Sequence, residues 1–132
     1  MEYKFTDYDF SQLGLKIEHI EKFSDCQISI VNEVTIDREK RLKEFILFAD
    51  INFESIKKQI VCKKCYQYAV KYIDTKKCKN NLDFIYSLNC SAIQLREDNL
   101  FDIVLDNEEI FFGHYIAGVF SQDWEYEGYC LC

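Results

Sequence analysis

Alternating apolar and polar positions organise the last third of the chain. Ile93 to Arg96 alternates with period two, and Leu100 to Leu105 resumes the same kind of segment, as expected for strands with one buried face. Polar turn signals follow at 97–99, 106–109 and 121–123. The segment 110–120 is apolar almost throughout and predicts a central strand, in which Gly113 and Gly118 indicate a bulge or a close backbone approach. With an alternating segment at 124–131, residues 91–132 predict a β-meander.

Strands are also predicted near the N-terminus. Residues 15–20 alternate strictly, and 27–36 alternate again after a turn at 23–25, with a bulge or break at 32–33. These two segments predict an N-terminal hairpin. Aromatic residues at positions 3, 5, 8 and 10 suit a short strand and a turn that pack onto the core.

Helical spacing appears between these two groups of strands. Leu42, Phe45, Ile46 and Ala49 recur on one helical face, with Asp37 as the expected N-cap. A second helix is predicted from 52 or 53 to about 73, and a short third helix at 82–88. Strands, then two to three helices, then strands predict an α+β fold, with helices packed on one face of a mostly antiparallel sheet.

Length and composition indicate one soluble domain spanning 1–132. The chain has 132 residues, of which 48% are hydrophobic and 30% charged, with no proline and four glycines. No apolar run reaches the roughly 20 residues of a membrane span, and the N-terminus lacks a signal-peptide layout. Seven cysteines, an odd number, predict reduced thiols rather than a disulfide framework. We therefore expect a cytoplasmic protein.

Charge changes this picture, because the acidity is concentrated in the meander. No Lys or Arg follows Arg96, whereas the first 96 residues carry slightly more basic than acidic side chains and the whole chain has a net charge of −7. Charged strand faces and turns are common. However, the excess carboxylates repel one another, and a cationic partner would offset this repulsion. Trp and Tyr, which lie between the carboxylates, are frequent interface anchors. The predicted partner-binding residues are Glu97, Asp98, Asp102, Asp106, Glu108, Glu109, Asp123, Trp124, Glu125, Tyr126 and Glu127.

Two other features suggest chemistry. Cys62 and Cys65 form a Cys-x-x-Cys motif, and a zinc site would need two more ligands, which Cys130 and Cys132 could supply. Because the motif falls within the pattern of the second helix, we expect buried thiols, no metal or cofactor, and no redox role. His114 could act as a general acid or base beside the carboxylates, or could satisfy backbone groups of the sheet, which we favour.

Lysines gather along the second predicted helix and after it, from 57 to 79. They could bind nucleic acid, but the acidic net charge favours a solvated helix face instead. Phosphate-binding glycine motifs are absent from the sequence. We therefore expect no direct contact with nucleic acid.

The meander resembles small bacterial α+β domains that have a Leu-x-x-x-x-Ile strand followed by a Phe-x-Gly-His-x-Ile strand. The matching segments are Leu88 to Leu95, Phe101 to Leu105 and Ile110 to Ile116. Comparable small acidic proteins occur as immunity proteins of contact-dependent growth-inhibition and polymorphic toxin systems. The resemblance implies a protein without catalytic activity that binds and neutralises a cognate toxin, here a basic nuclease domain whose active site or substrate surface it covers. The alternative is a small-molecule-binding protein or enzyme that uses His114 and neighbouring carboxylates.

Overall fold

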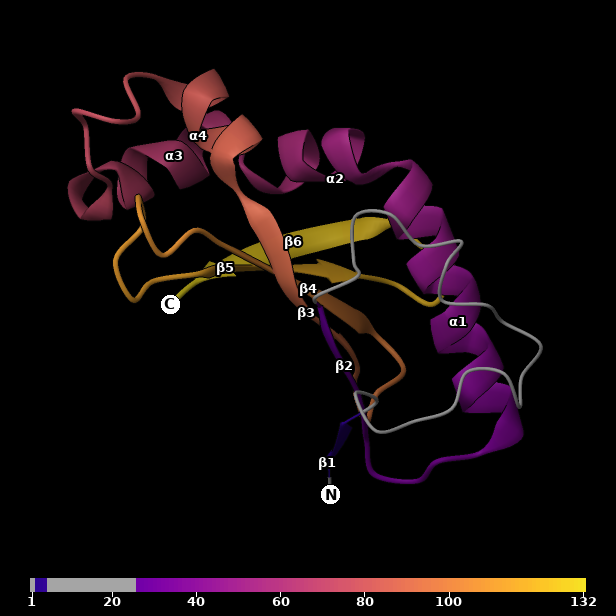
Figure 1. Cartoon of the computed structure of the whole chain (residues 1–132). Helices are drawn as coiled ribbons and strands as arrows, with labels where there is room; N and C mark the ends of the chain where they lie inside the picture. The colour runs from indigo at the N-terminus through magenta and orange to yellow at the C-terminus, as the bar shows by residue number, and fades with distance from the viewer. Residues whose placement is uncertain (1, 5–25) are drawn as a thin grey trace.

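The computed structural model describes residues 2–4 and 26–132 (Figure 1). Within these ranges the chain forms four α-helices, a short 3-10 helix and one sheet, so the α+β class is confirmed. In chain order the elements are β1 (Glu2–Lys4), β2 (Gln27–Val31), α1 (Ile36–Ile51), α2 (Phe53–Ile60), α3 (Lys63–Ala69), η4 (Val70–Tyr72), α4 (Asn81–Ser87), β3 (Asn89–Leu95), β4 (Phe101–Asp106), β5 (Ile116–Phe120) and β6 (Tyr126–Leu131).

The sheet is mixed, which corrects the predicted mostly antiparallel arrangement. Its strands follow the chain order from β1 to β6, and β2 and β3 run parallel while the other neighbours are antiparallel. A parallel pair needs a crossover connection, and here the whole helical region lies between β2 and β3. The predicted strand at 15–20 lies outside the described residues. The strand predicted at 27–36 ends at Val31, where Asn32 adopts a positive φ of 70°.

The helical region contains more breaks than its hydrophobic pattern suggested. Helix α1 is capped by the hydroxyl of Thr35, which accepts from the Arg38 amide at 3.1 Å, so the prediction of Asp37 as N-cap is wrong. The predicted helix from 52 to 73 is three elements, because the chain leaves helical geometry at Val61 and Cys62. Val61 and Cys65 are both buried. The break therefore lets each short helix turn its own apolar residues towards the sheet.

The predicted central strand at 110–120 is also corrected. Only Ile116–Phe120 forms β5. The preceding residues are turns in which the Phe111 amide donates to the Asn107 carbonyl at 2.7 Å. Phe111 is buried in the core while its neighbour Phe112 is 59% exposed. These residues anchor a loop rather than extend a strand, because Gly113 has a φ of 68° that turns the chain before β5.

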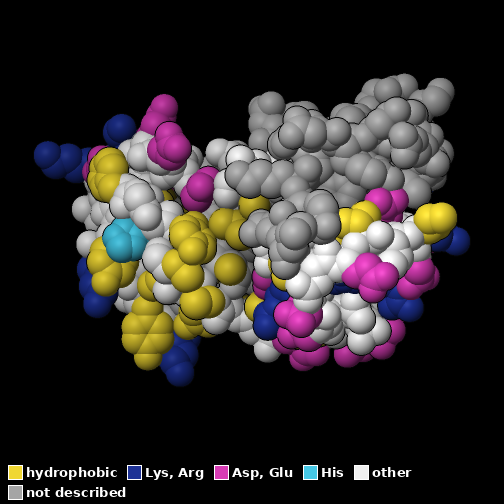
Figure 2. Space-filling view, turned by 90° about the horizontal axis from the view of Figure 1, so that it is seen from below, with side chains coloured by type: hydrophobic (Ala, Val, Ile, Leu, Met, Phe, Trp, Pro, Cys, Tyr) yellow, Lys and Arg dark blue, Asp and Glu magenta, His cyan; other side chains and the backbone are white. Residues whose placement is uncertain are grey.

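The core lies between the helices and one face of the sheet. On β4, Phe101 is buried and alternates with residues of the opposite face that are partly exposed, as the sequence predicted. Phe45 of α1 stacks on Phe101 with ring centroids 4.2 Å apart and also contacts Phe120 of β5. The helices thus cover one face of the sheet (Figure 1), and no helix of the described residues covers the other face, which Figure 2 shows in part. No helix in residues 2–4 and 26–132 is both long enough and apolar enough to cross a bilayer.

Candidate functional site

In the meander, the predicted site residues lie at two opposite ends of the sheet. Successive hairpin turns of an antiparallel meander lie at alternate ends. The β3–β4 turn with Glu97 and Asp98 therefore shares an end with the β5–β6 turn, and the pairing of Phe101 with Phe120 brings the two turns together. Asp106, Glu108 and Glu109 lie at the other end, on the β4–β5 side. We call Glu97, Asp98, Asp123, Glu125 and Glu127 the acidic end.

Arg38 of α1 fixes this end of the sheet. Its guanidinium donates to the carbonyl oxygens of Val31 and Arg96, both at 2.7 Å, to that of Glu33 at 2.6 Å, and to the side-chain oxygen of Asn99 at 3.3 Å. The five-donor fork of arginine suits such a cluster of oxygens. Arg38 therefore ties the start of α1 to the β3–β4 turn.

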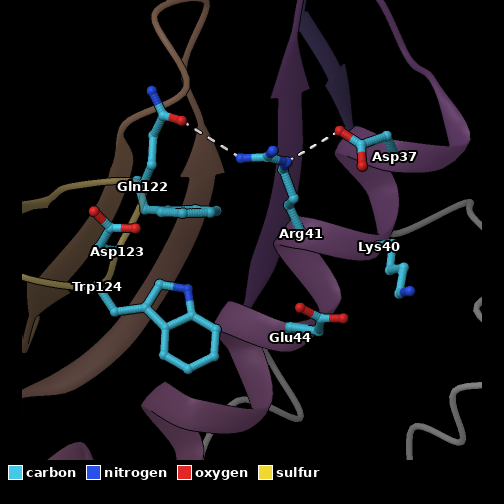
Figure 3. A pocket seen from close by; sticks show the side chains of 8 residues that line it. Asp37, Lys40, Arg41, Glu44, Gln122, Asp123 and Trp124 are labelled. Atoms are coloured by element: carbon cyan, nitrogen blue, oxygen red, sulfur yellow. Dashed lines mark hydrogen bonds and ion pairs between the residues drawn. The ribbon is translucent and has the colours of Figure 1, made fainter.

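A cleft of about 460 Å³ opens between α1 and the β5–β6 turn (Figure 3). Arg41 spans it, forming an ion pair with Asp37 at 3.0 Å and donating to the side-chain oxygen of Gln122 at 3.5 Å. The lining residues are Asp37, Lys40, Arg41, Glu44, Phe101, Gln122, Asp123 and Trp124. Of these, the sequence predicted only Asp123 and Trp124 as site residues. The α1 residues carried a recognisable pattern of paired charges, but nothing in the chain pattern placed them against a turn some 80 positions away.

Trp124 forms one wall of the cleft, and its own backbone has an unusual conformation. Its amide donates to the Ser121 carbonyl at 3.0 Å, and the Ser121 hydroxyl accepts from the amides of Asp123 and Glu125. The turn places Trp124 at φ 68°, a conformation for which hairpin loops usually use glycine. For a residue with a side chain, the left-handed region costs roughly 1–2 kcal/mol. The indole stacks on Phe48 at 4.8 Å, a contact that offsets this strain.

Comparing glycine and alanine at position 124 tests this strain. Both variants lose the indole stack, but only glycine adopts a φ of 68° freely. We expect Trp124→Gly to unfold in urea with a free energy about 1 kcal/mol higher than Trp124→Ala. At the neighbouring exposed Glu125, which has no positive φ, the order should reverse, with alanine more stable than glycine. Equal stability of the two Trp124 variants would contradict a strained turn.

Four carboxylates of the acidic end form no ion pair with another described residue. Arg96 pairs with Asp98 at 3.0 Å and with Asp102 at 3.7 Å. Burial raises the pKa of Asp102, and Arg96 lowers it in part. By contrast, no ion pair within the described part of the chain involves Glu97, Asp123, Glu125 or Glu127. Exposed carboxylates without an ion pair among the described residues therefore flank the Trp124 turn, as Glu108 and Glu109 do at the opposite end of the sheet.

Tyr126, predicted to bind the partner, packs into the protein instead. It lies 5.5 Å from the Phe120 ring and against the core. Burial and the nearby Cys62 and Cys65 raise its pKa to about 12. Its phenol thus lies on the covered face of the sheet, whereas Glu125 and Glu127 on either side of it are exposed.

His114 belongs to the opposite end of the sheet. Its ring stacks on Tyr72 with centroids 4.1 Å apart, and its Nδ1 lies 3.2 Å from the Cys132 carbonyl oxygen. These contacts hold the ring between the η4 turn and the end of β6. Figure 2 shows the histidine at one end of the molecule, with Asp and Glu side chains both near it and towards the other end.

The Cys62–Cys65 motif lies at a helix start, not inside a helix as predicted. Cys62 is exposed and caps α3, its sulfur accepting from the Cys65 amide at 3.4 Å. Burial, with a smaller effect of Cys62, raises the pKa of Cys65 to about 12, so this thiol is a poor nucleophile at neutral pH. No group of three or more His, Cys, Asp or Glu side chains that could hold a metal occurs within residues 2–4 and 26–132.

The arrangement at the acidic end suits binding. A stacked aromatic wall, a cleft and four carboxylates without an ion pair in the described part of the chain lie at one end of the sheet. Comparison of this chain with protein families, with curated protein sequences and with solved structures gave no significant match.

Proposed function

We propose that this protein is an inhibitor of the immunity type, which binds a cationic toxin domain through the acidic end of its sheet. The observation that carries the proposal is the Trp124 turn. It holds a large aromatic side chain in a strained conformation at the wall of a cleft, near four carboxylates that form no ion pair among the described residues. Strained backbone held by its surroundings often accompanies function.

The fixed geometry would help binding in two ways. Because Phe48 and the Ser121 hydrogen bonds already hold the Trp124 turn, a partner would lose little entropy in ordering it. Because the surrounding carboxylates are exposed, they would attract a cationic surface during encounter and set its orientation. Aromatic residues in well-packed, desolvated pockets, ringed by contacts that exclude water, are the usual centre of a strong interface.

The mechanism of inhibition is occlusion. Nucleases carry Lys and Arg side chains for phosphate contacts. When those cations pair with Glu97, Asp123, Glu125 and Glu127, the nucleic acid loses its contact surface. A stable complex of this kind covers about 800 Å² on each partner.

The test is co-expression with a nuclease-type toxin domain encoded beside this gene. We expect the wild-type chain to restore growth, to form a one-to-one complex with the purified domain, and to abolish its nuclease activity. Complex formation should weaken as salt concentration rises, since exposed charge pairs are screened. Undiminished killing in the presence of folded protein, or a gene neighbourhood with no toxin, would contradict the proposal.

A further inference from the structure

Two exposed thiols meet at the end of β6, away from the Trp124 turn. Cys130 and Cys132 are two residues apart on one strand, so their side chains share a face. Their sulfur atoms are 3.4 Å apart, and both side chains are exposed. They line a groove of about 310 Å³ on the open face of the sheet (Figure 2).

Neighbouring groups distinguish the two sulfurs. The Tyr115 side chain hydrogen-bonds to the Cys132 side chain, and backbone bonds of 2.9 Å in both directions join Tyr115 to Cys132. The hydrogen bond to Cys132 raises the pKa of Tyr115 and, as the largest cause, also that of Cys130. The Cys132 sulfur therefore has two hydrogen-bonding neighbours, the Tyr115 hydroxyl and the Cys130 thiol.

The other thiols of the described chain lack this combination. Cys26 and Cys90 have sulfurs 3.3 Å apart, but both are buried. Cys62 is exposed, but Cys65 is buried with its pKa raised. Among residues 2–4 and 26–132, only the β6 pair brings two exposed thiols into contact.

We propose that Cys130 and Cys132 form a reversible dithiol–disulfide site that exchanges with low-molecular-weight disulfides of the glutathione type. One of the two thiols loses its proton to water, and its thiolate attacks one sulfur of oxidised glutathione. The glutathione disulfide bond breaks, and one glutathione leaves as a thiolate. The other thiol, deprotonated in turn, attacks the protein sulfur of the mixed disulfide and releases the second glutathione. The protein loses two electrons, and oxidised glutathione gains them.

Strand geometry makes the oxidised form easy to reduce. Alternate Cα atoms of an extended strand are about 6.7 Å apart, at the upper end of the separation that disulfides tolerate, roughly 4.4–6.8 Å. Closing the bond must therefore bend the end of β6, where Cys132 pairs with Tyr115. Strained and exposed disulfides are the labile ones that take part in exchange. The site would thus alternate between its dithiol and disulfide forms rather than act as a permanent disulfide that stabilises the fold.

Redox equilibration with purified protein tests the site. Wild type, Cys130→Ser and Cys132→Ser are incubated with mixtures of reduced and oxidised glutathione, quenched with acid, alkylated and mapped by mass spectrometry. We expect wild type to form a Cys130–Cys132 disulfide and to retain no glutathione at this pair. Cys130→Ser should retain one glutathione on Cys132, because the resolving thiol is gone. Cys132→Ser should likewise retain one glutathione on Cys130.

Two controls keep the result interpretable. Cys62→Ser removes another exposed thiol and should leave oxidation of the β6 pair unchanged. Circular dichroism should show that all variants fold, since both sulfurs are exposed at the end of a strand. A wild-type protein that retains glutathione as Cys130→Ser does, or that shows no Cys130–Cys132 disulfide at any ratio, would overturn the proposal. Toxin protection by Cys130→Ser should equal that of wild type, so this test stands apart from the proposed function.

Discussion

Charge reversal at Glu125 and Glu127 is expected to slow association with a cationic partner by roughly tenfold or more at low salt, within the range that electrostatic steering supplies. Both side chains are exposed, and neither has an internal ion pair among the described residues. Replacing them by Lys therefore removes attraction and adds repulsion without breaking a contact of the fold. The measurement is the association rate, taken by stopped flow at several salt concentrations.

The opposite end of the sheet offers a matched control for this experiment. Glu108 and Glu109 are also adjacent to a meander turn and exposed, so Glu108→Lys with Glu109→Lys changes the net charge equally. We expect this control to slow association much less. Its altered charges lie at the opposite end of the sheet from the Trp124 turn, and charges separated by more than a Debye length, about 8–10 Å, are largely screened. Equal slowing by both variants would point to net charge alone. Unchanged rates in the Glu125 and Glu127 variant would remove the acidic end from the interface.

Replacing Gly118 by alanine is expected to lower the free energy of unfolding by about 1–3 kcal/mol. A Cβ atom at Gly118 would overlap the Cγ1 and Cδ1 atoms of Ile60, whose side chain is fully buried. Helix α2 rests on β5 at this point, so the helix or the strand must shift to admit a methyl group. Urea unfolding measures the effect.

A second substitution shows whether the overlap is the cause. Ile60→Val removes the Cδ1 atom and alone should cost about 0.5–1.5 kcal/mol. Combined with Gly118→Ala, it should cost less than the sum of the two single effects. Gly113→Ala is the control, because its Cβ meets open space and only its φ of 68° opposes alanine. Ile60→Val should not rescue that variant. Strict additivity for Gly118 and Ile60 would contradict a packing clash.

Local patterns predicted the elements whose geometry depends on near neighbours. The alternation around Phe101 in β4, the turns of the meander and the apolar stripe of α1 around Phe45 all follow from periods of two and 3.6 residues. The same patterns misled where both faces of a segment are apolar. Residues 110–115 have strand-like composition, yet Phe111 is buried beside Phe84 while Gly113 turns the chain. Periodicity cannot distinguish an anchored loop from a strand covered on both sides.

By itself, the sequence determined the α+β class, the meander and the excess of carboxylates after Arg96, because each is written in composition and local spacing. The tertiary structure alone decided that β2 and β3 run parallel and that the carboxylates divide between two ends of the sheet. It also decided that Arg38 and Arg41 of α1 meet turns 58 to 81 residues away. Such contacts depend on how the helices pack on the sheet. This packing joins segments that are distant in sequence, and the local hydrophobic periodicity does not predict it.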